Sequence, residues 1–321
     1  MKWQKKGLIF EPEKHTLTDE CTEFAQSPQT LVFDDYVRIY FSTRKKEPEN
    51  GMYLSFISYV DFSKDFSQIL KLSDKSVIGL GELGTFDEHG IFPINPFMHE
   101  GKITAYTCGW NRRAVVPVET SIGLATSEDG GETFQRYGHG PVLTSSLKEP
   151  FLVGDGFVKY YEGTYHMWYI FGVRWMEETA DEPVARVYKI GHATSQDGIH
   201  WEKEEGRQII DDQLNEDECQ ALPTVLKIGD KYHMYFCYRE ATDFRTNPAR
   251  GYRLGYAWSE DLKNWHREDD KAGIALSSEG WDSEMMCYPH IFEVDGKACL
   301  LYNGNKFGRF GFGLAELSSE E

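Results

Sequence analysis

The sequence predicts an all-β protein folded as a five-bladed β-propeller, and three observations support this prediction. A segment made of an apolar run, a two-residue turn and an aromatic-rich run occurs five times along the 321 residues. A second hairpin pattern follows each of these segments except the last. No part of the sequence has the apolar period of a helix. Four short antiparallel strands repeated five times are typical of sheets arranged radially as the blades of a propeller.

The first hairpin of each unit is recognised by its turn. Residues 217–240, DECQALPTVLKIGDKYHMYFCYRE, and residues 282–305, DSEMMCYPHIFEVDGKACLLYNGN, are two of the copies. The second residues of the five turns are spaced by 66, 62, 67 and 66 positions. Short β-type runs around such a turn predict a hairpin. The turns are Asp34-Asp35, Glu100-Gly101, Glu162-Gly163, Gly229-Asp230 and Asp295-Gly296.

The second hairpin supplies the outer two strands of a blade. Residues 119–136, 188–203 and 252–267 share Gly-x-Ala-x-Ser-x-Asp, followed by an aromatic and a basic residue, and we interpret Ser-x-Asp as a structural turn. The fifth unit ends without a fourth strand. The N-terminal Trp3 and Gly7 match Trp201 and Gly206 of an outer strand. We therefore expect the N-terminal strand to complete the last blade, with residues 1–321 forming a single domain.

Composition and charge argue against some classes of binding partner for this protein. The formal net charge of -18 argues against nucleic acid or an anionic membrane as a partner. No run of roughly 18 apolar residues predicts a membrane helix, and the N-terminus lacks the apolar segment of a signal peptide. The six cysteines have irregular spacing without a CxxC pair, which indicates reduced thiols in a cytoplasmic protein. No calcium loop of the Asp-x-Asp-x-Asp-Gly type occurs, and we expect neither a metal nor a cofactor.

Carboxylates recur where the inner strand of each blade begins. In four units a glutamate stands five residues before a proline, and these glutamates are Glu23, Glu88, Glu218 and Glu284. The third unit offers Glu149 and Asp155 instead. Basic, amide and aromatic residues stand at the end of the second strand, across the hairpin from the glutamates: Arg44, Trp110, Asn111, Arg112, Arg174, Trp175, Arg239, Asn303 and Asn305. Two interpretations stay open, because such ion pairs either join neighbouring blades, once per repeat, or supply acid–base chemistry.

The irregular positions are the better catalytic candidates, since a catalytic residue is needed once and a structural one five times. Asp87 or Glu88 is expected as one catalytic carboxyl and Asp155 or Glu218 as the other, with His89 close to the first pair. The loops that leave the second strands are basic, for example TRKKEPENG and REATDFRTNPARG. In a protein this acidic, they predict a ligand with a carboxylate, phosphate or sulfate group.

The pattern resembles the five-bladed propeller glycosidases: glycoside hydrolase family 43, the invertase and levansucrase families, and the mannoside phosphorylases of family 130. The resemblance rests on the repeated hairpins and on YTCGWN, CYPHIF and LYNGN, and it is closest to bacterial members found among polysaccharide genes. In family 43 an aspartate before the blade-one proline is the general base, and a blade-two aspartate tunes its pKa. Ser27 and Asn95 stand near those positions here, so the sequence departs from that pattern.

The resemblance implies a carbohydrate-active enzyme, and we expect a glycoside hydrolase acting on an oligosaccharide or glycan precursor with an anionic group. Paired carboxylates would lie roughly 6.5–9.5 Å apart in an inverting enzyme and about 5–5.5 Å apart in a retaining one. Trp110 and Trp175 would stack on sugar rings. The other residues expected to contact the substrate are Glu23, His89, Asn111, Arg112, Arg174, Arg239, Glu284, Asn303 and Asn305. Two alternatives stay open, a glycoside phosphorylase and a non-catalytic propeller that binds a glycan or a partner protein.

Overall fold

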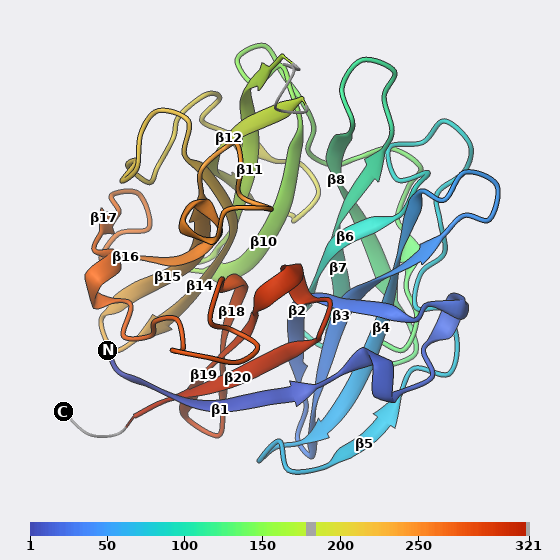
Figure 1. The fold of residues 1–321 in the computed structure, drawn as a ribbon, viewed down its shortest axis with the longest axis vertical. Helices are drawn as coiled ribbons and strands as arrows, with labels where there is room; N and C mark the ends of the chain where they lie inside the picture. The colour runs from blue at the N-terminus through green and yellow to red at the C-terminus, as the bar shows by residue number, and fades with distance from the viewer. Residues whose placement is uncertain (178–183, 319–321) are drawn as a thin grey trace.

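The computed structural model describes residues 1–177 and 184–318, and within them it confirms the predicted architecture. Five four-stranded antiparallel sheets surround a common centre (Figure 1). Apart from the strands, the described residues form only short 3-10 helices, which are η1 (Pro12–Lys14), η2 (Thr18–Glu20), η3 (Pro248–Arg250), η4 (Asp269–Lys271) and η5 (Asn305–Gly308).

Each sheet is one blade, and in blades one to four the strands follow chain order from the centre outward. Blade one holds β2 (Glu23–Val32), β3 (Tyr36–Lys46), β4 (Tyr53–Ser63) and β5 (Ile69–Leu72). Blade two holds β6 (Ile91–His99), β7 (Lys102–Asn111), β8 (Glu119–Ser127) and β9 (Gln135–Arg136). Blade three holds β10 (Val153–Tyr161), β11 (Thr164–Met176), β12 (Ala185–Ser195) and β13 (Glu202–Lys203). Blade four holds β14 (Cys219–Ile228), β15 (Lys231–Arg239), β16 (Arg253–Ser259) and β17 (His266–Arg267).

Blade five joins the two ends of the protein, as the sequence predicts. Its strands are β18 (Cys287–Val294), β19 (Lys297–Asn303), β20 (Phe312–Leu317) and the N-terminal β1 (Trp3–Phe10). Strand β1 pairs antiparallel with β20, so that Trp3 lies opposite Leu317 and both strands run side by side in Figure 1. The buried Trp3 indole donates a hydrogen bond of 2.8 Å to the Tyr235 hydroxyl of blade four. The N-terminal strand therefore closes the ring.

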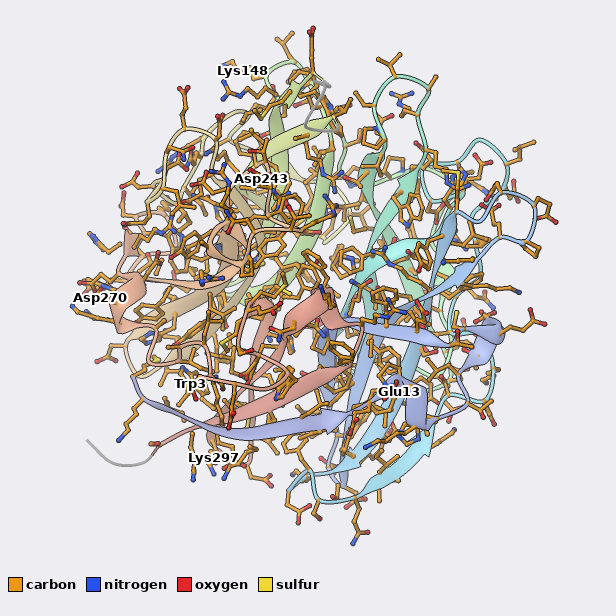
Figure 2. The ribbon with its side chains drawn as sticks, viewed as in Figure 1. Trp3, Glu13, Lys148, Asp243, Asp270 and Lys297 are labelled. Carbon is orange, nitrogen blue, oxygen red and sulfur yellow. The ribbon has the colours of Figure 1, made fainter. Side chains whose placement is uncertain are left out.

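Side chains fill the space between neighbouring sheets (Figure 2). The largest fully buried side chains are aromatic, among them Tyr40, Trp168 and Phe236. The Ser-x-Asp segments form turns, as expected: the Asp197 carboxylate accepts hydrogen bonds of 2.8 Å from the backbone N–H groups of Ile199 and His200. Bonds of this kind, together with the one to the His200 ring, hold the pKa of Asp197 below its usual range.

Every inner strand has a bulge near its start. The pairing of inner and second strand shifts register at the equivalent place in all five blades. In four blades the bulge residue has a positive φ, between 49° and 55°. A bulge re-aims a side chain relative to the regular strand. The five bulge residues are Ser27, Phe92, Asp155, Leu222 and Tyr288.

Candidate functional site

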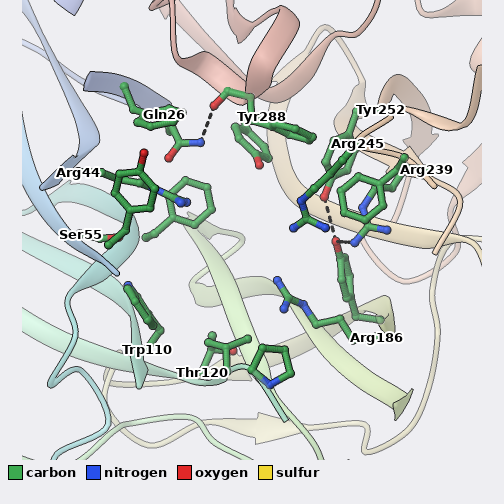
Figure 3. A pocket seen from close by; sticks show the side chains of 18 residues that line it. Gln26, Arg44, Ser55, Trp110, Thr120, Arg186, Arg239, Arg245, Tyr252 and Tyr288 are labelled. Atoms are coloured by element: carbon green, nitrogen blue, oxygen red, sulfur yellow. Dashed lines mark hydrogen bonds between the residues drawn. The ribbon is translucent and has the colours of Figure 1, made fainter. Parts of the chain in front are cut away.

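A cavity of about 360 Å³ opens where the five inner strands begin, and we call it the central pocket. All five blades contribute to its wall, which Figure 3 shows from close by. Aromatic rings and arginines predominate, and no aspartate or glutamate is among its described lining residues. The lining residues are Phe24, Gln26, Arg44, Tyr53, Ser55, Phe92, Trp110, Pro117, Val118, Thr120, Arg186, Tyr188, Arg239, Phe244, Arg245, Tyr252, Tyr288 and Phe307.

Arg239 is the most firmly held of the four arginines. It ends β15 and is only 3% exposed. Its guanidinium donates hydrogen bonds to the Glu240 carbonyl at 2.7 Å and to the Tyr188 hydroxyl at 2.9 Å. It also lies 3.6 Å from the centre of the Phe244 ring. These contacts fix the direction of the cation, and none of these three neighbours contributes a negative charge through the contacting group.

Arg44 and Arg245 are held by aromatic rings. The Arg44 guanidinium lies between 5.4 and 5.8 Å from the ring centres of Phe24, Tyr53 and Phe92, and Arg245 lies 4.3 Å from that of Phe244. Among the residues that the structure describes, no hydrogen bond or ion pair reaches either guanidinium. Burial lowers the pKa of both groups, and neighbouring arginines lower it further. Two partly desolvated cations therefore face the cavity.

Three tyrosines add neutral hydroxyl groups. The Tyr188 and Tyr252 hydroxyls lie 2.9 Å apart in a hydrogen bond, and Tyr288 lies on the blade-five bulge. Burial raises the pKa of all three phenols, so they are uncharged at neutral pH. Uncharged phenols donate and accept hydrogen bonds, which suits them to the hydroxyl groups of a ligand.

Asp155 lies at the base of this arrangement. A narrower cavity of about 90 Å³ is lined by Asp155 and shares six lining residues, among them Arg186 and Tyr288, with the central pocket. The Leu222 backbone N–H donates a 3.3 Å hydrogen bond to the Asp155 carboxylate. Burial raises the pKa of Asp155 to about 7, although the Leu222 N–H and the Arg186 cation oppose the shift. Near neutral pH this carboxyl is therefore available as a proton donor.

Asp87 and Glu218 belong to a different, repeated feature, a buried ion pair in each of blades two to five. In each pair, the carboxylate comes shortly before the inner strand, and its partner is a basic residue on the outer strand of the same blade. This basic residue follows an aromatic residue by two positions. The pairs are Asp87–Arg136 at 2.6 Å, Glu149–Lys203 at 2.6 Å, Glu218–Arg267 at 2.5 Å and Asp282–Lys5 at 2.7 Å. Neither Asp87 nor Glu218 lines the central pocket. Their assignment as catalytic residues stays a prediction.

Several other predicted residues lie outside the pocket, in local contacts. Glu23 forms an ion pair of 2.9 Å with Arg309, and Glu88 accepts a 3.1 Å hydrogen bond from the Gly84 N–H. Arg112 pairs with Glu47 at 2.6 Å. The remaining contacts pair Arg174 with Asp217, Asn111 with the Thr85 carbonyl, and Trp175 with the Arg186 cation at 5.9 Å. Only Trp110, Arg239 and, through the narrower cavity, Asp155 reach the pocket among the predicted site residues.

The two asparagines of blade five have structural hydrogen bonds. The buried Asn303 side chain accepts from the Ser27 N–H at 2.8 Å and donates to the Ala25 carbonyl at 2.8 Å, linking blade five to blade one. Asn305 accepts a 2.8 Å bond from the Glu284 N–H.

His89 packs against the pocket residue Trp110, with ring centres 5.5 Å apart. Burial lowers the pKa of His89.

Arg186 and Arg245 are pocket residues that sequence reasoning did not single out. Arg186 lies near the beginning of β12, directly across from Trp175 of β11, whereas the sequence pattern drew attention to the ends of second strands. Arg245 belongs to the basic loop REATDFRTNPARG, whose composition did point to an anionic ligand. Within this loop, the sequence signal that could have identified Arg245 as a pocket residue was its position next to the aromatic Phe244.

Among the residues that the structure describes, no group of three or more His, Cys, Asp or Glu side chains is placed to hold a metal ion. Across the same residues, no helix combines the length and the apolar character needed to cross a bilayer.

Comparison with known proteins finds relatives over the whole length and over part of it. No protein-family model matches the sequence. Uncharacterized protein Rv1502 of Mycobacterium tuberculosis (strain ATCC 25618 / H37Rv) is 32% identical over 321 residues, which cover 99% of this chain and 100% of that protein. A β-1,2-mannobiose phosphorylase of Thermoanaerobacter sp. (strain X514) is 32% identical over 107 residues, or 32% of this chain and 34% of the phosphorylase.

Solved structures share the fold at low sequence identity. The protein BT0996, in a structure described as an RGII complex, is similar with a TM-score of 0.73 and 17% identity, covering 99% of this chain and 91% of BT0996. A thermostable family-43 glycoside hydrolase has a TM-score of 0.66 and 14% identity, covering 95% of this chain and 94% of its own. A structure from work on the GH130 mannoside phosphorylases has a TM-score of 0.68 and 14% identity, and the match covers 100% of this chain and 94% of the other.

Proposed function

This protein belongs to the family of the mycobacterial protein Rv1502, and from this premise and the central pocket we propose that it is a carbohydrate-active enzyme that cleaves a glycosidic bond in an anionic saccharide. The observation that carries the proposal is a single carboxyl with a pKa of about 7 beneath a pocket walled by four arginines. The glycoside hydrolases and phosphorylases among the structures of the same fold support a sugar as the ligand.

Each part of the pocket has a role in this proposal. Protonated Asp155 donates its proton to the glycosidic oxygen as that oxygen leaves the anomeric carbon. The arginines bind the anionic group of the substrate. The tyrosine hydroxyls bond sugar hydroxyls, and the rings of Trp110 and Phe307 stack against the apolar faces of the sugar.

A specific observation favours inorganic phosphate over water as the nucleophile. A hydrolase needs a second carboxylate to activate water. Among the described residues, Asp155 is the sole carboxylate that lines the central pocket or the narrower cavity, and Asp243 lines only a neighbouring cavity that shares Arg186 and Arg245. Phosphate is already an anion and attacks without a protein base, and arginines are well suited to hold it. Phosphorolysis is therefore the second candidate reaction.

The test compares wild type with Asp155→Asn on neutral and anionic oligosaccharides, each with and without inorganic phosphate, with products separated by chromatography. We expect wild type to release product at a rate that declines as the pH rises through about 7. A general acid contributes roughly 10² to 10⁴ in rate, so Asp155→Asn should lose about that factor while still binding substrate. The product, a free sugar or a sugar phosphate, separates hydrolysis from phosphorolysis.

Asp230→Asn is the matched control, because Asp230 is an exposed aspartate in the turn between β14 and β15, away from the pocket. It should leave the rate unchanged. Full turnover by Asp155→Asn would disprove the role of Asp155. Saccharide binding without product in wild type would instead favour a propeller that binds glycans without catalysis.

A further inference from the structure

The arginines of the central pocket stand at two separate places. Arg44 lies near the end of β3 in blade one, opposite Glu23 of β2, and on one wall of the pocket (Figure 3). Arg186, Arg239 and Arg245 come from blades three and four and face it from the other wall (Figure 3). The rings of Phe92 and Tyr288 lie on the wall between them. The positive charge is therefore divided between two walls.

The blade-three and blade-four arginines also line a second cavity. This cavity has a volume of about 410 Å³ and shares Arg186, Arg239 and Arg245 with the central pocket. Its remaining lining includes the small polar residues Thr242 and Thr246 and one acidic residue, Asp243, whose carboxylate lies 4.0 Å from the Arg250 guanidinium. A ligand in the central pocket thus has room to continue past these arginines, whereas Arg44 lines the central pocket alone.

Among the described residues, no carboxylate forms an ion pair with Arg44, Arg186 or Arg245, although Asp155 lies close enough to Arg186 to be affected by its charge and Asp243 lines the second cavity. Arg44 is surrounded by rings, which attract a cation but carry no net charge. The charged groups that act most strongly on Arg245 are two other cations, Arg239 and Arg186. Taking unpaired charges out of water is unfavourable. Arg245 and Arg186 act on Arg44 across the pocket, but an anion bound directly by these two arginines on one wall still leaves Arg44 on the other wall without a bonded partner. Each place calls for its own anionic group.

We propose that the substrate carries two anionic groups, one bound by Arg44 and the other by Arg186 and Arg245 at the junction of the two cavities. This inference rests on the proposed function, since it specifies the saccharide as doubly anionic. Suitable classes are two linked uronic acids or a uronic acid that carries a phosphate or sulfate group. One group at each wall also orients the sugar across the pocket, above Asp155.

The test measures affinity by titration calorimetry for ligands with one or two anionic groups. Glucuronic acid and glucose 1-phosphate carry one charged group each, while glucuronic acid 1-phosphate and digalacturonic acid carry two at different separations. Inorganic pyrophosphate carries two without a sugar. For wild type we expect at least one of the two-group saccharides to bind tenfold or more tightly than either one-group ligand.

Two variants assign the groups to their places. Arg44→Gln and Arg245→Gln should each reduce the affinity of the preferred two-group saccharide to about that of a one-group ligand. Arg44→Gln should leave unchanged the affinity for the one-group ligand that binds at Arg245. Arg245→Gln should leave unchanged the affinity for a one-group ligand that binds at Arg44. Arg207→Gln is the control, because Arg207 is an exposed arginine paired with Glu204 outside both cavities. It should change none of these affinities.

The outcomes separate this inference from the function on which it rests. Equal affinity of wild type for one-group and two-group saccharides would overturn the inference but leave an anionic saccharide as substrate. Loss of the same one-group ligand in both variants would overturn it too, because it would show a single anion site. Binding of pyrophosphate with the predicted response of both variants, but of no saccharide, would overturn the proposed function and keep the two anion sites.

Discussion

At the scale of single residues, the chemistry of Asp155 follows from its backbone. The residue sits on the bulge of β10 with a φ of 53°, a left-handed conformation that aspartate tolerates better than most side chains. This places the carboxyl in a narrow cavity beneath the arginines. Burial favours the uncharged form, and a lone N–H donor from Leu222 is too little to reverse that preference.

The same burial predicts how stability depends on pH. The Asp155 pKa rises from 3.8 in the unfolded state to about 7 in the folded protein. At a pH between these two pKa values, Asp155 therefore takes up a proton when the protein folds. As a result, the free energy of unfolding of the wild type falls by up to about 4 kcal/mol as the pH rises from about 4 to above 7. Asp155→Asn removes this loss.

We expect urea denaturation to show Asp155→Asn as more stable than wild type at pH 8 by a few kcal/mol, and about equally stable at pH 4. A stability difference that is the same at both pH values would contradict the raised pKa.

At the scale of the blade, the repeated buried ion pair joins the segment before the inner strand to the outer strand. In blade three, Glu149 is fully buried and contacts Lys203, the Tyr169 hydroxyl and the Gly206 N–H. The pair ties the segment before inner strand β10 to outer strand β13 of the same blade, so it fixes the path of that segment. Its cost in desolvation is offset only while both partners are present.

Removing one partner should therefore be costly. Glu149→Gln keeps the shape and most hydrogen bonds but leaves the buried Lys203 ammonium without its carboxylate, and we expect a loss of about 3 kcal/mol in the free energy of unfolding. Chemical denaturation measures it. Glu11→Gln, which breaks the exposed pair with Lys14, is the control and should cost less than about 1 kcal/mol. Equal losses would mean that the buried pair contributes no more than a surface pair.

The sequence was informative where the structure repeats and less informative where it does not. Hairpin spacing and the match between Trp3 and Trp201 predict five blades and the closing strand, because turns and strand patterns are local. Of the paired carboxylates, Glu218 belongs to the repeated glutamate pattern, and Asp87 and Glu149 were named beside it, but Asp282 was missed in favour of Glu284. The partner of each was sought on the second strand. The partner lies on the outer strand, as in Glu218–Arg267, and only the twist and pairing of the whole sheet bring these positions together.

The pocket was predicted least well for a related reason. Arg186 enters it from the start of a third strand and Arg245 from an irregular loop, and neither place follows from the repeat. Asp155 was identified as an irregular residue near the channel, but its raised pKa depends on burial by residues from other blades, such as Tyr252 and Tyr288. Contacts between blades are remote in sequence.

At the scale of the whole molecule, the first and last strands meet in one blade. The Ser318 N–H donates a 2.9 Å hydrogen bond to the Lys2 carbonyl, and β1 buries Trp3 and Phe10 against its neighbours. Losing even one such buried aromatic side chain costs about 3–5 kcal/mol. We propose that residues 1–321 act as one cooperative domain whose closure depends on β1.

A circular permutant tests this proposal. Joining residue 321 to residue 1 by a short Gly-Ser linker, with new ends at the turn between Glu162 and Gly163, keeps all strand pairs. We expect it to unfold in a single calorimetric transition near the wild-type temperature. Deleting residues 1–10 removes β1, and that variant should fail to give a folded protein. Two separate transitions in wild type, or a folded deletion variant, would contradict the proposal.

The five bulges have a consequence for how such a protein changes over generations. Duplication of one blade copies the bulge with it, so each unit inherits the same break in its inner strand. At three of the five positions, Phe92, Asp155 and Tyr288, the residue lines the central pocket or the narrower cavity. Four of these positions now hold Ser27, Phe92, Leu222 and Tyr288 and only one holds an acid. A single substitution of Ser27 or Leu222 by aspartate would add a second acid at an inherited position. New chemistry in this architecture is thus one mutation away, without a new backbone.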